Sequence, residues 1–284
     1  MAVSNWLMGK ISRWLNMNVE IDSSEIPLTD FERLSEELRL GDVLLVEGRS
    51  RVSNIIKSIT FSPWTHSVLY IGRLSEINDG NLKNRIAEHY RGDRNQQLIV
   101  EAMLGEGTVI YPVSKYRNHH LRICRPRGIS KSDRQKVIAY TLSQLGYDYD
   151  IKHLFDLMRF LLPYSIIPRR WRSSLFVHNA GESTKNVCSY LLGEAFGSIN
   201  FPILPVAERS ENGNYKLYKR NPKLLTPKDF DYSPYFDIIK YPFIGLDDVA
   251  AYRALPWDTE GKVYDSTGDE YYISINDSIE DDDN

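Results

Sequence analysis

Five short runs of apolar residues, separated by polar turns, predict β-strands. The third and fourth runs are joined through Gly105, Glu106 and Gly107, a connection whose length is typical of a β-hairpin. The five predicted strands cover residues 41–47, 64–72, 98–102, 108–111 and 120–124. In a strand, alternate side chains face opposite sides of the sheet. His66 therefore shares a face with Tyr70, and Glu101 falls inside an otherwise apolar strand.

Apolar residues at helical spacing predict a second set of elements. Ser130 and Asp133 are typical of a capped helix start, and Pro227 suits the first position of a short helix. The predicted helices cover residues 50–60, 130–145, 188–197 and a turn from Thr226. Residues 78–97 are polar, and we expect them to form an excursion on the surface.

The same pattern divides the chain into three parts. Residues 1–35 form an N-terminal arm in which residues 3–17 have amphipathic helical spacing. We expect this arm to pack on the domain or on a partner subunit. The alternative is a helix lying on a membrane surface, although two basic residues give it little support. Residues 36–240 form the main domain, and residues 241–284 form an extension with an acidic tail.

Composition narrows the choice of protein class. A chain of 284 residues can bury a full core, and its net charge of −3 gives no reason to expect nucleic acid as a partner. Two cysteines make no disulfide framework and favour reduced thiols. The N-terminus lacks the pattern of a secretory signal, and no window is long enough for a membrane-spanning helix. We therefore expect a cytoplasmic protein.

Three polar residues far apart in the sequence together suit nucleophilic catalysis. Cys188 begins a predicted helix, where unpaired N–H groups and the helix dipole favour a thiolate. If the strands of His66 and Glu101 are neighbours, the carboxylate can hold the imidazole through its second nitrogen. A thiol, an imidazole and a carboxylate supply the nucleophile, base and orienting group of covalent acyl transfer.

Each of these residues also has a simpler interpretation. Glu101 could form an ordinary salt bridge, His66 could be a hydrogen-bonded core histidine, and Cys188 could be a buried structural thiol. We interpret Cys124 as a packed strand residue. The adjacent histidines at 119 and 120 lack a second ligand pair at zinc spacing, so we predict neither a metal nor a cofactor.

The order and spacing of these motifs resemble the NlpC-type papain-like superfamily, in the circularly permuted branch that includes YiiX-like proteins and the lecithin–retinol acyltransferase group. Here the histidine precedes the cysteine, as that branch implies. The matching stretches lie within residues 36–240, at 41–43, 64–72, 100–102, 146–150, 187–191, 226–230 and 233–234.

The resemblance implies an α+β fold of permuted papain-like type, with a small antiparallel sheet packed on helices. It assigns Cys188 as nucleophile, His66 as base and Glu101 as the third polar residue. The implied activity is a cysteine hydrolase that attacks an amide bond, in a peptide or a cell-wall-like fragment, through a thioester. Tyr70 and Tyr149 are expected substrate contacts, with core packing as the simpler interpretation.

Two other functions remain open from the sequence. The same site could act on a lipid acyl chain, as in the acyltransferase group, with support from the apolar stretch 155–171 and the N-terminal arm. The chain could instead be a binding module that retains the fold without catalysis. The expected partner is thus a small-molecule, peptide or lipid substrate, with peripheral membrane contact through the arm as a further hypothesis.

Overall fold

The computed structural model describes most of the predicted main domain. The described residues are Met17, 26–77, 79–103, 105–146, 188–209, 213–246, 249–257, 262–264 and 270–272. The chain forms two compact units, Met1–Phe243 and Ile244–Asn284. The helix predicted over residues 3–16, the apolar stretch 155–171 and Tyr149 lie outside the described residues.

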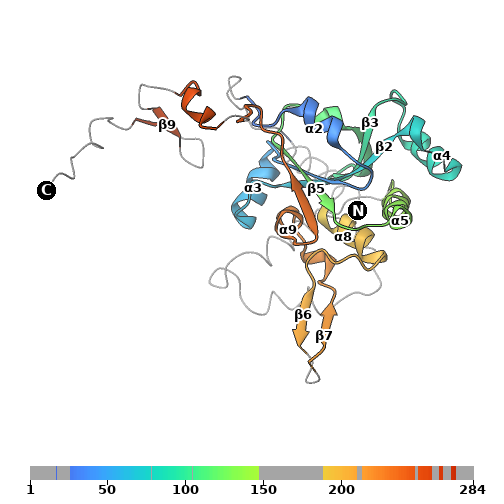
Figure 1. Ribbon diagram of the computed structural model, residues 1–284. Helices are drawn as coiled ribbons and strands as arrows, with labels where there is room; N and C mark the ends of the chain where they lie inside the picture. The colour runs from blue at the N-terminus through green and yellow to red at the C-terminus, as the bar shows by residue number, and fades with distance from the viewer. Residues whose placement is uncertain are drawn as a thin grey trace, which may run out of the picture. The chain divides into compact units, whose positions relative to one another are not determined.

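A six-stranded antiparallel sheet forms the centre of the first unit (Figure 1). The strand order is β4-β3-β2-β1-β5-β8, and every neighbouring pair runs antiparallel. The strands are β1 (Val43–Val46), β2 (His66–Arg73), β3 (Gln97–Met103), β4 (Gly107–Pro112), β5 (Leu121–Pro126) and β8 (Phe236–Ile239). Five of them correspond to the strands predicted from the sequence. The α+β class is therefore confirmed.

The predicted hairpin joins β3 to β4 at the position of its glycines. Gly105 and Gly107 have φ angles of +81° and +78°, a left-handed conformation that glycine adopts without steric cost. The turn sets the register in which Glu101 pairs with Val109. It thereby places the segment that follows β4 beside the Glu101 side of the sheet.

Helices enclose the sheet and close its two faces. They are α2 (Phe31–Glu37), α3 (Arg51–Thr60), α4 (Gly80–His89), α5 (Lys131–Ser143), α8 (Cys188–Ser198) and α9 (Pro227–Tyr232), together with the short 3₁₀ helices η1 (Leu74–Glu76), η2 (Val113–Tyr116) and η4 (Pro222–Leu224). The second unit contains one further 3₁₀ helix among its described residues, η5 (Ala251–Ala254). The predicted caps are present: the Ser130 side chain accepts from the backbone N–H of Asp133, and Thr226 forms a capping box with Asp229.

Residues 78–97 are largely exposed, as predicted, but they are not without regular structure. They contain α4, whose N-cap Asp79 accepts hydrogen bonds from the backbone N–H groups of Asn81 and Leu82. Ile86 is fully buried and anchors the helix to the core. Leu82 also packs on the core, and Arg85 donates to the carbonyls of Leu142 and Ser143. Two apolar contacts on one side are too weak a pattern to identify this helix from the sequence.

The core divides between the two faces of the sheet. One face carries Leu69 and Val100 and packs against α5 and α8, whose buried residues include Leu192 and Phe196. The opposite face carries Tyr70 and packs in a second cluster that includes residues of α2 and η2. This division follows the alternation predicted for the His66 and Glu101 strands.

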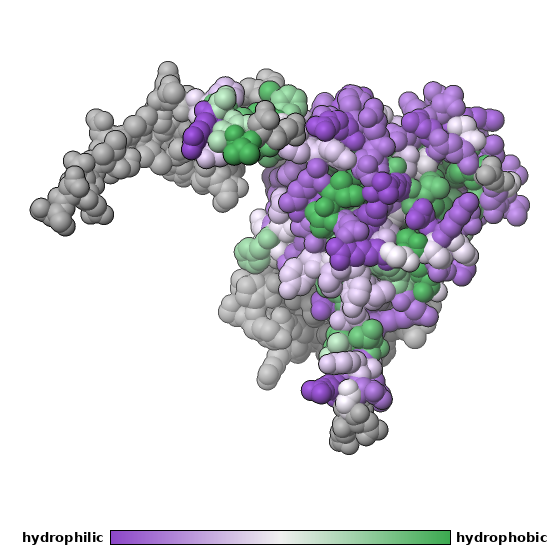
Figure 2. Space-filling model, in the orientation of Figure 1, coloured by the Kyte–Doolittle hydropathy of each residue, from purple (hydrophilic) through white to green (hydrophobic). Residues whose placement is uncertain are grey.

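The remaining strands form two small hairpins that the sequence pattern did not predict. β6 (Val206–Arg209) pairs with β7 (Tyr215–Tyr218) in the first unit, and β9 (Lys262–Tyr264) pairs with β10 (Glu270–Tyr272) in the second. The visible surface of the sheet-containing part is mainly hydrophilic (Figure 2). Among the described residues, no helix has the length and hydropathy needed to cross a bilayer.

Candidate active site

Antiparallel pairing of β2 with β3 brings two of the predicted site residues together. His66 is the first residue of β2, and Glu101 lies near the end of β3. The pairing of Leu69 with Val100 and of Tyr70 with Ile99 fixes the register. Because the strands run in opposite directions, the start of β2 lies beside the end of β3. Two residues 35 positions apart thus become neighbours.

The His66 ring is held by the Glu101 carboxylate. His66 Nε2 and Glu101 Oε2 form a short hydrogen bond, which is also an ion pair when the ring is protonated. The Glu101 side chain is 0% exposed and the His66 side chain 19% exposed. A carboxylate this deeply buried requires charged or hydrogen-bonding partners. With Nε2 engaged, the ring has Nδ1 available for a second partner.

Cys188 is the first residue of α8 and supplies that second partner. The residue is 6% exposed and clusters with Ala102 of β3 and Leu191 of its own helix. Its sulfur lies close enough to His66 and to the backbone N–H of Ser67 for both groups to lower the pKa of the thiol. The buried Ser67 hydroxyl also faces this sulfur, and it makes no hydrogen bond of ordinary geometry within the described part of the chain.

The charges of the three residues stabilise one another. Burial alone would raise the pKa of the Cys188 thiol, but attraction to His66 and hydrogen bonds from His66 and Ser67 outweigh it, so that this pKa falls below its usual 9.0. Burial opposes the charge on His66, yet Cys188 and Glu101 raise the pKa of its ring to about 10. The result favours a thiolate–imidazolium pair at neutral pH.

Two further residues hold the Glu101 carboxylate, and both lie in η2. Lys115 Nζ donates to Glu101 Oε1 at 2.5 Å, and the Tyr116 hydroxyl donates to Glu101 Oε2 at 2.5 Å. Burial opposes ionisation of Glu101, but His66 and Lys115 lower its pKa to about 2. The sequence analysis missed both residues. Nothing in their spacing marks them, because the β3–β4 turn and η2 together determine where they lie.

Comparison with known proteins identifies the type of domain. Residues 37–159 match a family described as permuted papain-like amidase enzyme, YaeF/YiiX, C92 family. This segment is a permuted papain-like sequence of the YiiX-like family. The match also supports the predicted class of the protein, a cysteine hydrolase. It includes His66 and Glu101, whereas Cys188 lies beyond the matched residues.

One solved structure similar to this chain is described as the metalloprotein yiiX from Escherichia coli O157:H7. It is 14% identical in sequence, the alignment covers 72% of this chain and 97% of that one, and the TM-score is 0.44. No curated protein matches the chain. Within the described ranges, no group of three or more His, Cys, Asp or Glu side chains is arranged to hold a metal ion.

Of the remaining candidate residues, Tyr70 and Cys124 are described and Tyr149 is not. Tyr70 is buried, and its hydroxyl accepts a hydrogen bond from Gln97 Nε2 at 3.2 Å. That environment agrees with the core-packing interpretation, and a substrate contact at Tyr70 stays a prediction. Tyr149 is not among the described residues. Cys124 is a fully buried strand residue, and burial raises its pKa well above the usual value.

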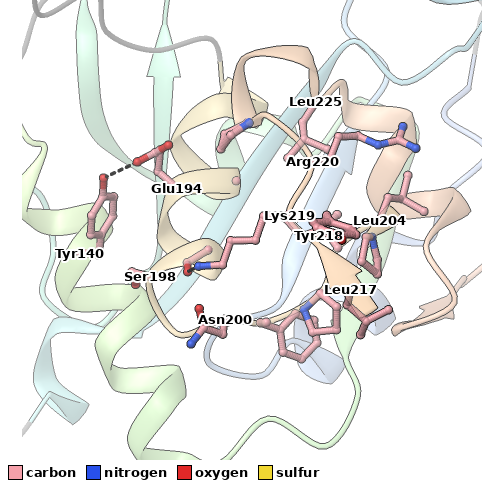
Figure 3. A pocket seen from close by; sticks show the side chains of 17 residues that line it. Tyr140, Glu194, Ser198, Asn200, Leu204, Leu217, Tyr218, Lys219, Arg220 and Leu225 are labelled. Carbon is pink, nitrogen blue, oxygen red and sulfur yellow. Dashed lines mark hydrogen bonds between the residues drawn. The ribbon is translucent and has the colours of Figure 1, made fainter. Parts of the chain in front are cut away.

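A separate cavity of about 580 Å³ lies at the other end of α8. Figure 3 shows Tyr140 and Glu194 on one side of it, joined by a hydrogen bond of 3.3 Å. Lys219 extends along the cavity, where its ammonium donates to the carbonyl of Gly197. The residues that line the cavity include none of the three candidate catalytic residues. This cavity is therefore separate from the cluster formed by Cys188, His66 and Glu101.

Proposed function

We propose that the protein is an amidase in which Cys188 is the nucleophile, His66 the general acid and base, and Glu101 the residue that orients the imidazole. The observation that carries this proposal is the position of His66, which is hydrogen-bonded to Glu101 through Nε2 and lies close enough to Cys188 for the two side chains to shift each other's pKa. This arrangement of thiol, imidazole and carboxylate meets the geometric requirement for an activated cysteine.

In the first step, the Cys188 thiolate attacks the carbonyl carbon of an amide. A carbon–sulfur bond forms, the carbonyl oxygen takes the electron pair, and a tetrahedral intermediate results. Collapse of this intermediate breaks the carbon–nitrogen bond, while the His66 imidazolium gives its proton to the leaving amine. The acyl group remains on Cys188 as a thioester.

In the second step, water hydrolyses the thioester. Neutral His66 takes a proton from the water as it attacks, and the carbon–sulfur bond then breaks to release a carboxylic acid. The proton on His66 restores the thiolate–imidazolium pair. Glu101 keeps the ring in place through both proton transfers, since its carboxylate remains ionised far below neutral pH.

The start of α8 supports the same chemistry at the substrate oxygen. The first N–H groups of a helix have no partner within the helix. The N–H of Cys188 is one of them, because α8 begins at this residue. A developing oxyanion next to the sulfur would accept a hydrogen bond from it.

The family match favours an amide as the scissile bond, in a peptide or a cell-wall-like fragment. An ester bond of a lipid would pass through the same thioester, so the site alone does not distinguish the two substrate classes. The two segments that favoured a lipid are the amphipathic part of the N-terminal arm, residues 3–17, and residues 155–171. Neither is among the described residues apart from Met17. We retain the lipid substrate as an outcome to be tested.

Selective alkylation tests the nucleophile. We expect iodoacetamide at pH 7 to label the parent protein once, on Cys188, because Cys124 is fully buried and its pKa is raised. Cys188→Ala should remain unlabelled, and the matched variant Cys124→Ala should be labelled at the parental rate. Peptide mass mapping locates the label. Equal labelling of the parent and Cys188→Ala would overturn the proposal.

Trapping of the acyl-enzyme distinguishes the substrate classes. The parent protein is incubated with peptidoglycan-derived peptides or with phosphatidylcholine vesicles, and the mass of the Cys188 peptide is measured. We expect an acyl adduct and a free amine from the peptides. A fatty-acyl adduct together with lysolipid would assign a lipid substrate. A reactive Cys188 that acquires an adduct from neither source would favour the binding module.

A further inference from the structure

The candidate site contains one more negative charge than the single positive charge of His66 can balance. With Cys188 and Glu101 both ionised, it contains two negative charges, whereas His66 supplies one positive charge. The Glu101 side chain is 0% exposed, so water does not neutralise the excess. An uncompensated charge at such depth is costly, and a buried group then takes up or releases a proton instead. A second cation is needed for both anions to persist.

Lys115 is placed to be that cation. Its ammonium lies 2.5 Å from Glu101 Oε1, on the opposite oxygen from the one that His66 contacts. The Lys115 side chain is only 26% exposed. Its Nζ also lies 2.9 Å from the Met103 sulfur and 3.7 Å from the centre of the Tyr111 ring. This cage of acceptors and an aromatic face keeps the charge in one place.

The groups around Lys115 come from three elements. From β3 come Glu101 and Met103, and from β4 comes Tyr111, whose hydroxyl donates to Glu106 at 2.6 Å. From η2 itself comes Tyr116, whose ring centre lies 5.3 Å from Lys115 Nζ. Close to these, His119 packs edge-on against Tyr116 with 5.2 Å between ring centres. Burial lowers the pKa of His119, and the charges of Arg49 and Lys115 lower it further, so that His119 favours the neutral form.

We propose that Lys115 is a positioning residue that supplies the second positive charge of the site and thereby allows Cys188 and Glu101 to be ionised together. This inference rests on the proposed function, since it assigns a role within the same site. Glu101 shares its negative charge between two cations, so the imidazolium is not committed to Glu101 alone. The remaining attraction of His66 is directed at the thiolate.

Tyr116 has a different role, although it contacts the same carboxylate. Its hydroxyl donates a hydrogen bond to Glu101 but carries no positive charge. Burial and the neighbouring Glu101 raise the pKa of Tyr116 well above its usual value, so it remains a neutral donor. A comparison of the two η2 residues therefore separates the effect of charge from the effect of hydrogen bonding.

The pH dependence of Cys188 alkylation tests this inference without knowledge of the substrate. The rate with iodoacetamide is measured from pH 5 to pH 10 for the parent, Lys115→Met, Lys115→Gln and Tyr116→Phe. Glutamine retains a donor to Glu101 but not the charge, which methionine also lacks. Lys136→Met is the control, because Lys136 forms an exposed ion pair with Asp133 on α5.

We expect Lys115→Met and Lys115→Gln to raise the apparent pKa of Cys188 by about one unit, the order of effect of a nearby opposite charge. Tyr116→Phe should shift it less, and Lys136→Met should match the parent. A Lys115→Gln profile that coincides with that of the parent overturns the proposal, whatever Lys115→Met does. Thermal unfolding of each variant identifies any that fail to fold.

The same alkylation profiles distinguish failure of the proposed function from failure of the role proposed for Lys115. If the parent protein showed a Cys188 pKa at or above the usual 9.0, the catalytic assignment itself would be wrong. If the parent pKa were low and the Lys115 variants left it unchanged, only the role of Lys115 would be rejected.

Discussion

The backbone N–H of Ser67 lies beside the Cys188 sulfur and helps to lower the pKa of the thiol, so β2 stabilises this thiolate through Ser67 as well as through His66. His66 and Ser67 are consecutive in β2, and they contribute a ring and a backbone donor to the same atom. Any shift of β2 relative to α8 would disturb both contacts together. The strand–helix packing therefore fixes the reactive sulfur as well as the core.

Ser67→Ala tests the part of this contact that comes from the side chain. The variant loses the hydroxyl that faces the sulfur and keeps the backbone N–H. We expect iodoacetamide alkylation of Cys188 at pH 7 to slow by less than about tenfold, which is the scale of one hydrogen bond. Ser58→Ala, on the exposed side of α3, is the control. An alkylation rate reduced to that of an ordinary buried thiol would mean that the hydroxyl matters more than the backbone.

Glu101→Gln tests the charge that raises the pKa of His66. The amide is similar in size to the carboxylate but neutral, and its NH₂ group meets the ammonium of Lys115. We expect the pKa of His66 to fall towards its usual value, the thiolate to lose stabilisation, and alkylation at pH 7 to slow by about tenfold or more. The melting temperature should also fall, since Lys115 loses its anionic partner. Glu76→Gln, at an exposed ion pair, should change neither quantity.

The pKa shifts of Cys188 and His66 predict a lower and an upper pH limit for activity. The pKa of Cys188 lies below 9.0, so the thiolate is present above that lowered value and is lost as pH falls through it. The imidazolium is present up to pH about 10 and is lost above it. Amide hydrolysis should therefore follow a bell-shaped profile between these limits. Rate measurements with a hydrolysed peptide check the profile, and a monotonic rise up to pH 11 would contradict it.

Phe196→Ala tests how far the core holds α8 in place. Phe196 is fully buried and its ring lies 5.5 Å from that of Phe236, measured between ring centres. Removal of a buried phenylalanine typically costs about 3–5 kcal/mol of unfolding free energy. Denaturant unfolding measures this loss, and Tyr232→Ala, at an exposed residue of α9, is the control. A loss below about 1 kcal/mol would show that α8 does not depend on this contact.

The sequence was sufficient to predict most strands of the sheet and the helix that carries Cys188. Strong apolar runs and caps identify those elements. It was also sufficient to predict that His66 and Glu101 could be neighbours, since a buried carboxylate within a strand needs a partner. These inferences depend on local pattern and on the general cost of burying charge. The structure places both residues as that argument requires.

Other features of the fold and of the site could not be predicted, because they depend on contacts between residues far apart in the sequence. β8 joins the sheet beside β5, more than 100 residues away in sequence, and its four residues give little periodicity. Lys115 and Tyr116 reach Glu101 only because η2 folds back after the β3–β4 hairpin. In sequence they resemble any polar residue and any aromatic residue near a turn. Tertiary packing therefore determines their roles.

The position of α8 in the chain has a consequence for the newly made protein. His66, Glu101 and Lys115 all lie within the first 115 residues, whereas the sulfur arrives with residue 188. During synthesis, the ribosome thus releases the proton-handling half of the centre well before the reactive half. Until α8 docks on the sheet, Cys188 lacks the neighbours His66 and Ser67 that lower the pKa of its thiol, so we expect it to react as an ordinary thiol in the nascent chain.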